Sequence, residues 1–120
     1  MIIIGGYMEL TKNLKKVIDA LNKTVVQKIV VYDMKTVTPF YDYTIIASCN
    51  SPRQGHASVN HLRDLAKEGF NVRSFSAMSD ALWYLVDLGE VVVHVFVGEE
   101  RNRYNLDGLY YGLDKIEIQD

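Results

Sequence analysis

The sequence of 120 residues contains a single cysteine, no long apolar run and no excess of positive charge. Cys49 alone cannot form an intrachain disulfide, and a cysteine-rich metal site is excluded for the same reason. No stretch approaches the roughly 18 consecutive apolar residues of a membrane-spanning helix. The apolar segment 1–4 is too short for the core of a secretory signal. We therefore expect a cytoplasmic protein that makes no membrane contact.

Acidic and basic side chains are nearly equal in number. The chain has 13 Lys and Arg and 15 Asp and Glu, which gives a formal charge of −2. General affinity for nucleic acid requires a basic electrostatic field. The sequence therefore gives no support for direct, sequence-specific contact with nucleic acid. The apolar fraction of 48% is that of an ordinary soluble domain, and the length suits one domain. We expect residues 8–120 to form that domain and residues 1–7 to be a poorly ordered extension.

The spacing of apolar residues predicts a chain in which helices and strands are mixed. Leu10–Asn22 has the periodicity of an amphipathic helix. Ser51–Glu68 begins with an N-cap serine, proline at the first helical position and glutamine three residues after the cap. Runs of β-branched and aromatic residues predict strands at 27–34, 43–49 and 72–75, a hairpin within 83–96 and a last edge strand at 115–118. This order predicts an α/β fold, with a mixed β-sheet and helices packed on it as an α/β sandwich.

The most apolar stretch of the chain, residues 83–96, reads WYLVDLGEVVVHVF. Two apolar runs joined by Gly89-Glu90 are typical of a β-hairpin with a two-residue loop. In that register Leu85 lies opposite His94, and Trp83 lies opposite Phe96. Alternation along the strands then gives a core face of Leu82, Tyr84, Val86, Leu88, Val91, Val93, Val95 and Val97. The other face carries Trp83, Leu85, Asp87, Val92, His94 and Phe96.

The second hairpin face mixes large aromatic side chains with an acid and a histidine, a composition typical of a partner-facing surface. Pattern alone leaves a second interpretation open, in which a further helix covers Trp83, Leu85 and Phe96 as core. Asp87 lies diagonally across from His94, so the two could act as an acid–base dyad or as a structural ion pair. The ion pair is the better interpretation, because no serine or cysteine is placed as a nucleophile.

Two other patterns of the sequence are candidate ligand sites. The turn before the helix at Ser51, with Arg53 beside free helix N–H groups, could bind an anion. It lacks G-x-G-x-x-G and a Walker lysine, so helix capping explains it better. A two-metal carboxylate site could be suggested by Asp33, Asp42, Asp80 and Asp87, but no clustered spacing supports one. We expect no metal and no cofactor.

The string Trp83–Phe96 resembles the signature of the ribosomal silencing factor family, RsfS, also called Iojap-like. Asp42-Tyr43 with the strand after it, and Ser51-Pro52-Arg53-Gln54, resemble two further family motifs. Downstream, the resemblance continues at Arg101, Tyr104, Leu106 and Leu109. It covers most of the chain, from about residue 10 to residue 118.

The resemblance implies a nucleotidyltransferase-like α/β fold in a protein that is not an enzyme. Family members bind the large ribosomal subunit through the ribosomal protein of the L14 family. There they block joining of the small subunit and so repress translation, and they often form homodimers. Carried onto this chain, the resemblance predicts partner-binding residues Trp83, Leu85, Asp87, His94, Arg101 and Tyr104. The alternative is a nucleotide-binding or nucleotidyltransferase-type enzyme that uses Asp33, Asp87 and Arg53.

Overall fold

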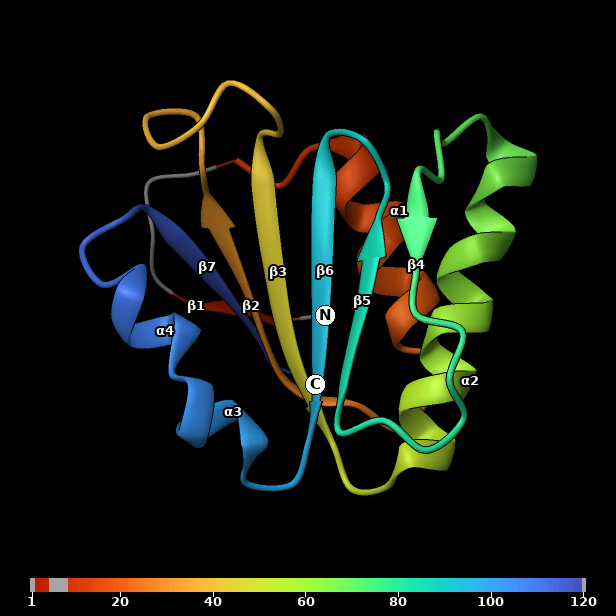
Figure 1. Ribbon diagram of the computed structural model, residues 1–120. Coiled ribbons are helices and arrows are strands. Elements are labelled where there is room, and N and C mark those ends of the chain that lie inside the picture. Colours follow the sequence, from red (N-terminus) through yellow and green to blue (C-terminus); the bar gives the residue numbers. More distant parts are fainter. Residues whose placement is uncertain (1, 5–8, 120) are drawn as a thin grey trace.

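The computed structural model describes residues 2–4 and 9–119, which form one twisted sheet with helices on both faces (Figure 1). The strands are β1 (Ile2–Ile4), β2 (Gln27–Asp33), β3 (Tyr43–Cys49), β4 (Ser74–Phe75), β5 (Trp83–Asp87), β6 (Val91–Val97) and β7 (Lys115–Gln119). The helices are α1 (Lys12–Leu21), α2 (Pro52–Arg63), the 3₁₀-helix η1 (Asp64–Glu68), α3 (Glu100–Tyr104) and α4 (Leu106–Leu109). The predicted α/β fold with a mixed sheet is confirmed.

The seven strands lie in the order β1-β7-β2-β3-β6-β5-β4. Central strands β3 and β6 are parallel, and every other neighbouring pair in this sheet is antiparallel. Helices α1 and α2 cover one face, whereas α3 and α4 lie along the other (Figure 1). The main core therefore fills the space between the sheet and α1 and α2. A smaller apolar cluster, centred on Ile46 and Phe96, lies on the face with α3 and α4.

The hairpin has the predicted register, with Trp83 opposite Phe96, Leu85 opposite His94 and Asp87 opposite Val92. The backbone N–H of Leu88 donates to the carbonyl of Val91 at 2.8 Å, which closes the two-residue loop. Gly89 has φ +89°, a conformation that glycine adopts without steric cost. On the predicted core face, Tyr84, Val86, Leu88, Val91, Val93, Val95 and Val97 are all buried.

Helix α2 begins where the capping signals predict. The side chain of Ser51 accepts from the N–H of Gln54 at 3.3 Å. Gln54 in turn accepts from the N–H of Asn50 at 2.7 Å, one residue before the position of an ideal capping box. Gly69 ends η1 with φ +93°. The bond to Ser51 satisfies an N–H group that the first turn of a helix cannot pair internally.

Three local predictions are wrong. Leu82 is 49% exposed because β5 begins only at Trp83. In the predicted helix Ser51–Glu68, helical spacing places Ala66 on one buried stripe with Val59, Leu62 and Leu65. Ala66 is instead exposed, because it lies in η1, where three residues per turn replace 3.6. Strand β7 is not at the edge of the sheet, because β1 pairs with it antiparallel on its outer side. Residues 2–4 thus form a strand within the predicted extension, and residues 1 and 5–7 lie outside the described residues.

Candidate functional site

The outer face of the hairpin carries an aromatic cluster, which consists of Trp83, His94, Phe96 and Tyr104. The indole Nε1 of Trp83 donates a hydrogen bond to Nδ1 of His94 at 3.0 Å. The ring centroid of Trp83 lies 4.9 Å from that of Phe96 and 4.6 Å from that of Tyr104. Tyr104 comes from the end of α3, so the cluster joins that helix to β5 and β6. Tilted rings at these separations make favourable aromatic contacts.

Burial within the aromatic cluster increases toward the sheet. Phe96 is fully buried and His94 is 8% exposed, whereas Tyr104 is 48% exposed. Trp83 and Leu85 are half-buried. The two interpretations of this face therefore each hold in part, since Phe96 and His94 are buried, whereas Trp83 and Tyr104 reach the surface.

The predicted pairing of Asp87 with His94 is wrong. Asp87 Oδ1 accepts from the N–H of Gly89 at 2.9 Å and so stabilises the hairpin turn. Burial lowers the pKa of His94 to about 4, so the imidazole is neutral at neutral pH. A neutral Nδ1 has the lone pair that the indole N–H of Trp83 requires. His94 is therefore a hydrogen-bond acceptor inside the cluster, and among residues 2–4 and 9–119 no acid or base pairs with it.

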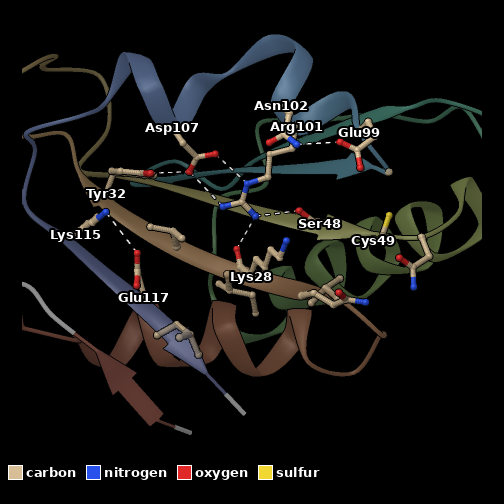
Figure 2. Close-up of a pocket in the computed structure, with 17 residues that line it drawn as sticks. Lys28, Tyr32, Ser48, Cys49, Glu99, Arg101, Asn102, Asp107, Lys115 and Glu117 are labelled. Carbon is tan, nitrogen blue, oxygen red and sulfur yellow. Dashed lines mark hydrogen bonds and ion pairs between the residues drawn. The ribbon is translucent and has the colours of Figure 1, made fainter.

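Arg101 does not face the aromatic cluster but extends across β2 and β3 (Figure 2). Its Nε and Nη2 donate to the carboxylate of Asp107 at 2.9 and 3.2 Å. Its Nη1 donates to the carbonyl of Lys28 at 2.6 Å and to Oγ of Ser48 at 3.0 Å. The hydroxyl of Tyr32 donates to Asp107 Oδ1 at 2.6 Å. We call these five residues the polar network.

Charge and burial oppose one another at the centre of the polar network. Burial raises the pKa of Asp107, but hydrogen bonds from Arg101 and Tyr32, together with the arginine charge, outweigh this effect and hold the pKa below its usual value. Burial and the hydrogen bond to Asp107 raise the pKa of Tyr32 well above its usual value. Asp107 is thus ionised and Tyr32 is protonated at neutral pH. The polar network lines a groove of about 800 Å³ beside β2 and the start of α3 (Figure 2).

The sequence model of the family described as "Ribosomal silencing factor during starvation" matches residues 8–120. The chain belongs to the ribosomal silencing factor family. A ribosomal silencing factor of Bacillus subtilis is 40% identical over 85 residues, which cover 70% of this chain and 72% of that protein. One from Halalkalibacterium halodurans is 32% identical over 107 residues, covering 88% and 92%. A crystal structure of a protein from Chromobacterium violaceum superposes with a TM-score of 0.79 at 30% identity, covering 88% of each chain.

The six predicted partner-binding residues do not form one site in this structure. Trp83, His94 and Tyr104 meet in the aromatic cluster, and Leu85 lies opposite His94 on the hairpin. Asp87 lies at the hairpin turn, and Arg101 belongs to the polar network. The six predicted residues do not include Phe96 of the aromatic cluster, nor Asp107 and Tyr32 of the polar network. Phe96 shares the outer hairpin face by alternation, whereas 75 residues separate Tyr32 from Asp107, so no local pattern connects them.

The residues of the alternative enzyme are not brought together. Asp33 ends β2 and Asp87 ends β5, and both strands run antiparallel to their neighbours β3 and β6. Arg53 follows the end of β3 and therefore lies at the opposite end of the strands from Asp33 and Asp87. Within residues 2–4 and 9–119, no group of three or more His, Cys, Asp or Glu is placed to hold a metal ion. No helix in the same residues is both long and apolar enough to cross a membrane.

Proposed function

We propose that this protein binds the large ribosomal subunit through the ribosomal protein of the L14 family. Bound there, in the cytoplasm, it blocks joining of the small subunit and represses translation without catalysing a reaction. The aromatic cluster carries this proposal, because it presents partly exposed Trp83, from the hairpin that carries the family string, beside Tyr104 of α3. Family membership supports the choice of the ribosome as target.

The exposed side of the aromatic cluster has the composition of a binding hot spot. Tryptophan and tyrosine supply large contact areas with few rotatable bonds, and they are enriched among residues that dominate binding energy. Trp83 is held on both sides, by the hydrogen bond to His94 and by the ring of Tyr104. A partner would therefore meet an ordered surface, and little side-chain entropy would be lost on docking.

The acidic excess of the C-terminal part of the chain suits a basic partner. Residues 99–120 contain six acids and three basic residues. Two of the acids, Glu99 and Glu100, lie at the start of α3, close in sequence to Tyr104. Ribosomal proteins are basic, and opposite charges around an apolar contact steer association and fix its orientation. We therefore assign this acidic excess to orientation and the aromatic cluster to affinity.

Repression then follows from size alone. The molecule extends over 35 × 33 × 28 Å, so one copy seated on the inter-subunit face would hold the two ribosomal subunits apart.

We further propose that a second copy of the chain can pair through the same exposed aromatic surface. Homodimer formation and docking would then compete, and added large subunits should lower the dimer fraction in light scattering. A dimer fraction that stays constant would contradict this competition.

Co-sedimentation with purified large subunits tests the docking assignment. Tyr104→Ala removes a side chain that is 48% exposed, so it should weaken binding about tenfold or more without unfolding the protein. The matched control is Tyr111→Ala, which removes the same side chain at a position that is 91% exposed. Trp83→Ala should behave like Tyr104→Ala. If wild type binds no better than Tyr104→Ala and Trp83→Ala, the docking assignment is wrong.

A further inference from the structure

We infer that Arg101 and Asp107 are positioning residues of the docking surface, because their ion pair fixes α3 on the sheet and so sets Tyr104 against Trp83. The inference rests on the proposed function for its binding readout. Its structural half, the placement of Tyr104 by the ion pair, is measured without the ribosome.

Helices α3 and α4 are too short to be stable on their own. They contain five and four residues, far fewer than the roughly 12 that a helix needs for marginal stability on its own. Neither of these two described helices contributes a buried residue to the core. The N-cap of α3, Glu99, makes no capping hydrogen bond through its side chain. Partly buried Leu106 and Tyr110 reach the smaller apolar cluster only after α3 has ended.

The side chain of Arg101, in contrast, is 12% exposed and reaches two strands. Through Nη1 it bonds Lys28 on β2 and Ser48 on β3, which are 73 and 53 residues away in the sequence. Lys28 has φ +53° at a register shift in β2. Its carbonyl accepts from Arg101, which supplies a reason for the strained backbone. The carboxylate of Asp107 fixes the orientation of the guanidinium through two hydrogen bonds.

The link from this ion pair to the aromatic cluster is geometric. Arg101 and Tyr104 are three residues apart in one helix, so they lie on the same side of it. With Arg101 held on β2 and β3, the ring of Tyr104 comes to lie over Trp83. Asn105 then takes φ +52° and bends the chain, and its side chain accepts from the N–H of Gly108. The bend brings Asp107 back toward Arg101.

Trp83 is the only tryptophan in the chain, so its fluorescence reports directly on the ring of Tyr104 above it. The test variant is Asp107→Asn, which keeps the shape of the side chain and removes its charge. We expect a red-shifted Trp83 emission, as Tyr104 moves away and water reaches the indole, and about tenfold weaker binding to purified large subunits. Asp107→Glu, which restores the charge, should recover part of both signals.

The matched control is Asp19→Asn, the same substitution at an exposed position on α1, on the opposite face of the sheet. It should change neither emission nor binding. If Asp107→Asn unfolds, Arg101→Lys replaces it, because lysine keeps the charge but loses the two-pronged bond. A red shift in folded Arg101→Lys then supports the inference.

Three results separate the possible failures. Unchanged Trp83 emission in folded Asp107→Asn, with binding equal to wild type, overturns the inference. Unchanged emission with weakened binding also overturns it, because Asp107 would then act on the partner directly. A red shift in Asp107→Asn, when wild type itself fails to bind large subunits, contradicts the proposed function and leaves the positioning role supported.

Discussion

The indole N–H of Trp83 donates to Nδ1 of His94 across the two strands of the hairpin, at 3.0 Å. This bond exists only while His94 is neutral, because a protonated imidazole has no free acceptor nitrogen. Burial lowers the pKa of His94 from its ordinary value of 6.5 to about 4. Protonation of one buried side chain therefore opposes both the fold and the order of the docking surface.

The pH dependence of stability follows from this shift. Between pH 6.5 and about 4 the unfolded chain binds a proton at His94 that the folded chain does not. The free energy of unfolding should therefore fall as pH drops through this window, by about 3 kcal/mol in total. His94→Asn keeps an acceptor near Trp83 but does not titrate, so its unfolding free energy should depend less on pH there. Urea denaturation at several pH values measures both slopes, and equal slopes would contradict the assignment.

A second prediction concerns the contact between α2 and β5. A Cβ atom on Gly55 would overlap the ring of Tyr84, which is fully buried. The ring cannot easily move, because the Tyr84 hydroxyl donates to the carbonyl of Pro52 at 3.0 Å and accepts from the N–H of Ala81 at 3.1 Å. Gly55→Ala should lower the free energy of unfolding by about 1–3 kcal/mol.

The control for Gly55→Ala is the double variant with Tyr84→Leu, a smaller side chain that leaves room for the new methyl group. The double variant should lose less stability than the two single variants together. Strict additivity in thermal or urea unfolding would show that the two residues do not collide.

The third prediction separates two roles of Asp87. Asp87→Asn retains the oxygen that accepts from Gly89, so the hairpin turn and the melting temperature should change little. If the charge of Asp87 meets a basic partner, binding to large subunits should still weaken, and most of all at low salt. Equal affinity of wild type and Asp87→Asn at every salt concentration would mean that the charge of Asp87 does not contribute to binding and that Asp87 acts only in the turn.

The fourth prediction concerns the start of α2. Ser51→Ala removes the oxygen that accepts from the N–H of Gln54, and the loss of an N-cap costs about 1 kcal/mol. Ser79→Ala, in the exposed loop before β5, is the matched control and should change unfolding by much less. Urea denaturation measures the free energy of unfolding of both variants. Equal losses would mean that Ser51 is not an effective cap.

Local signals predicted the hairpin register and the first turn of α2, because a two-residue loop and a capping serine act within a few residues. The partner of His94 could not be predicted in the same way. Trp83 and Asp87 are both its diagonal neighbours in the register, so alternation alone cannot choose between them. A preference for opposite charges favoured Asp87, but the N–H of Gly89 binds that carboxylate in the turn.

Sequence patterns cannot predict the contacts of the polar network, for a different reason. Arg101 and Asp107 are six residues apart and would not face one another on a continuous helix. They meet because Asn105 interrupts the helix with φ +52°. Tyr32 and Ser48 join them from strands whose order depends on the whole sheet. The resemblance to the family identified Arg101, while its bonding partners depend on the three-dimensional structure.

The most direct test of the central claim is a subunit-joining experiment with purified small and large subunits. The fraction of joined ribosomes is measured on sucrose gradients with increasing amounts of wild type, Tyr104→Ala and Tyr111→Ala. Repression by steric exclusion through the aromatic cluster predicts that wild type and Tyr111→Ala lower the joined fraction at the same concentrations. Tyr104→Ala should require a concentration about ten times higher for the same decrease. A joined fraction that wild type leaves unchanged, or that all three proteins lower equally, would contradict it.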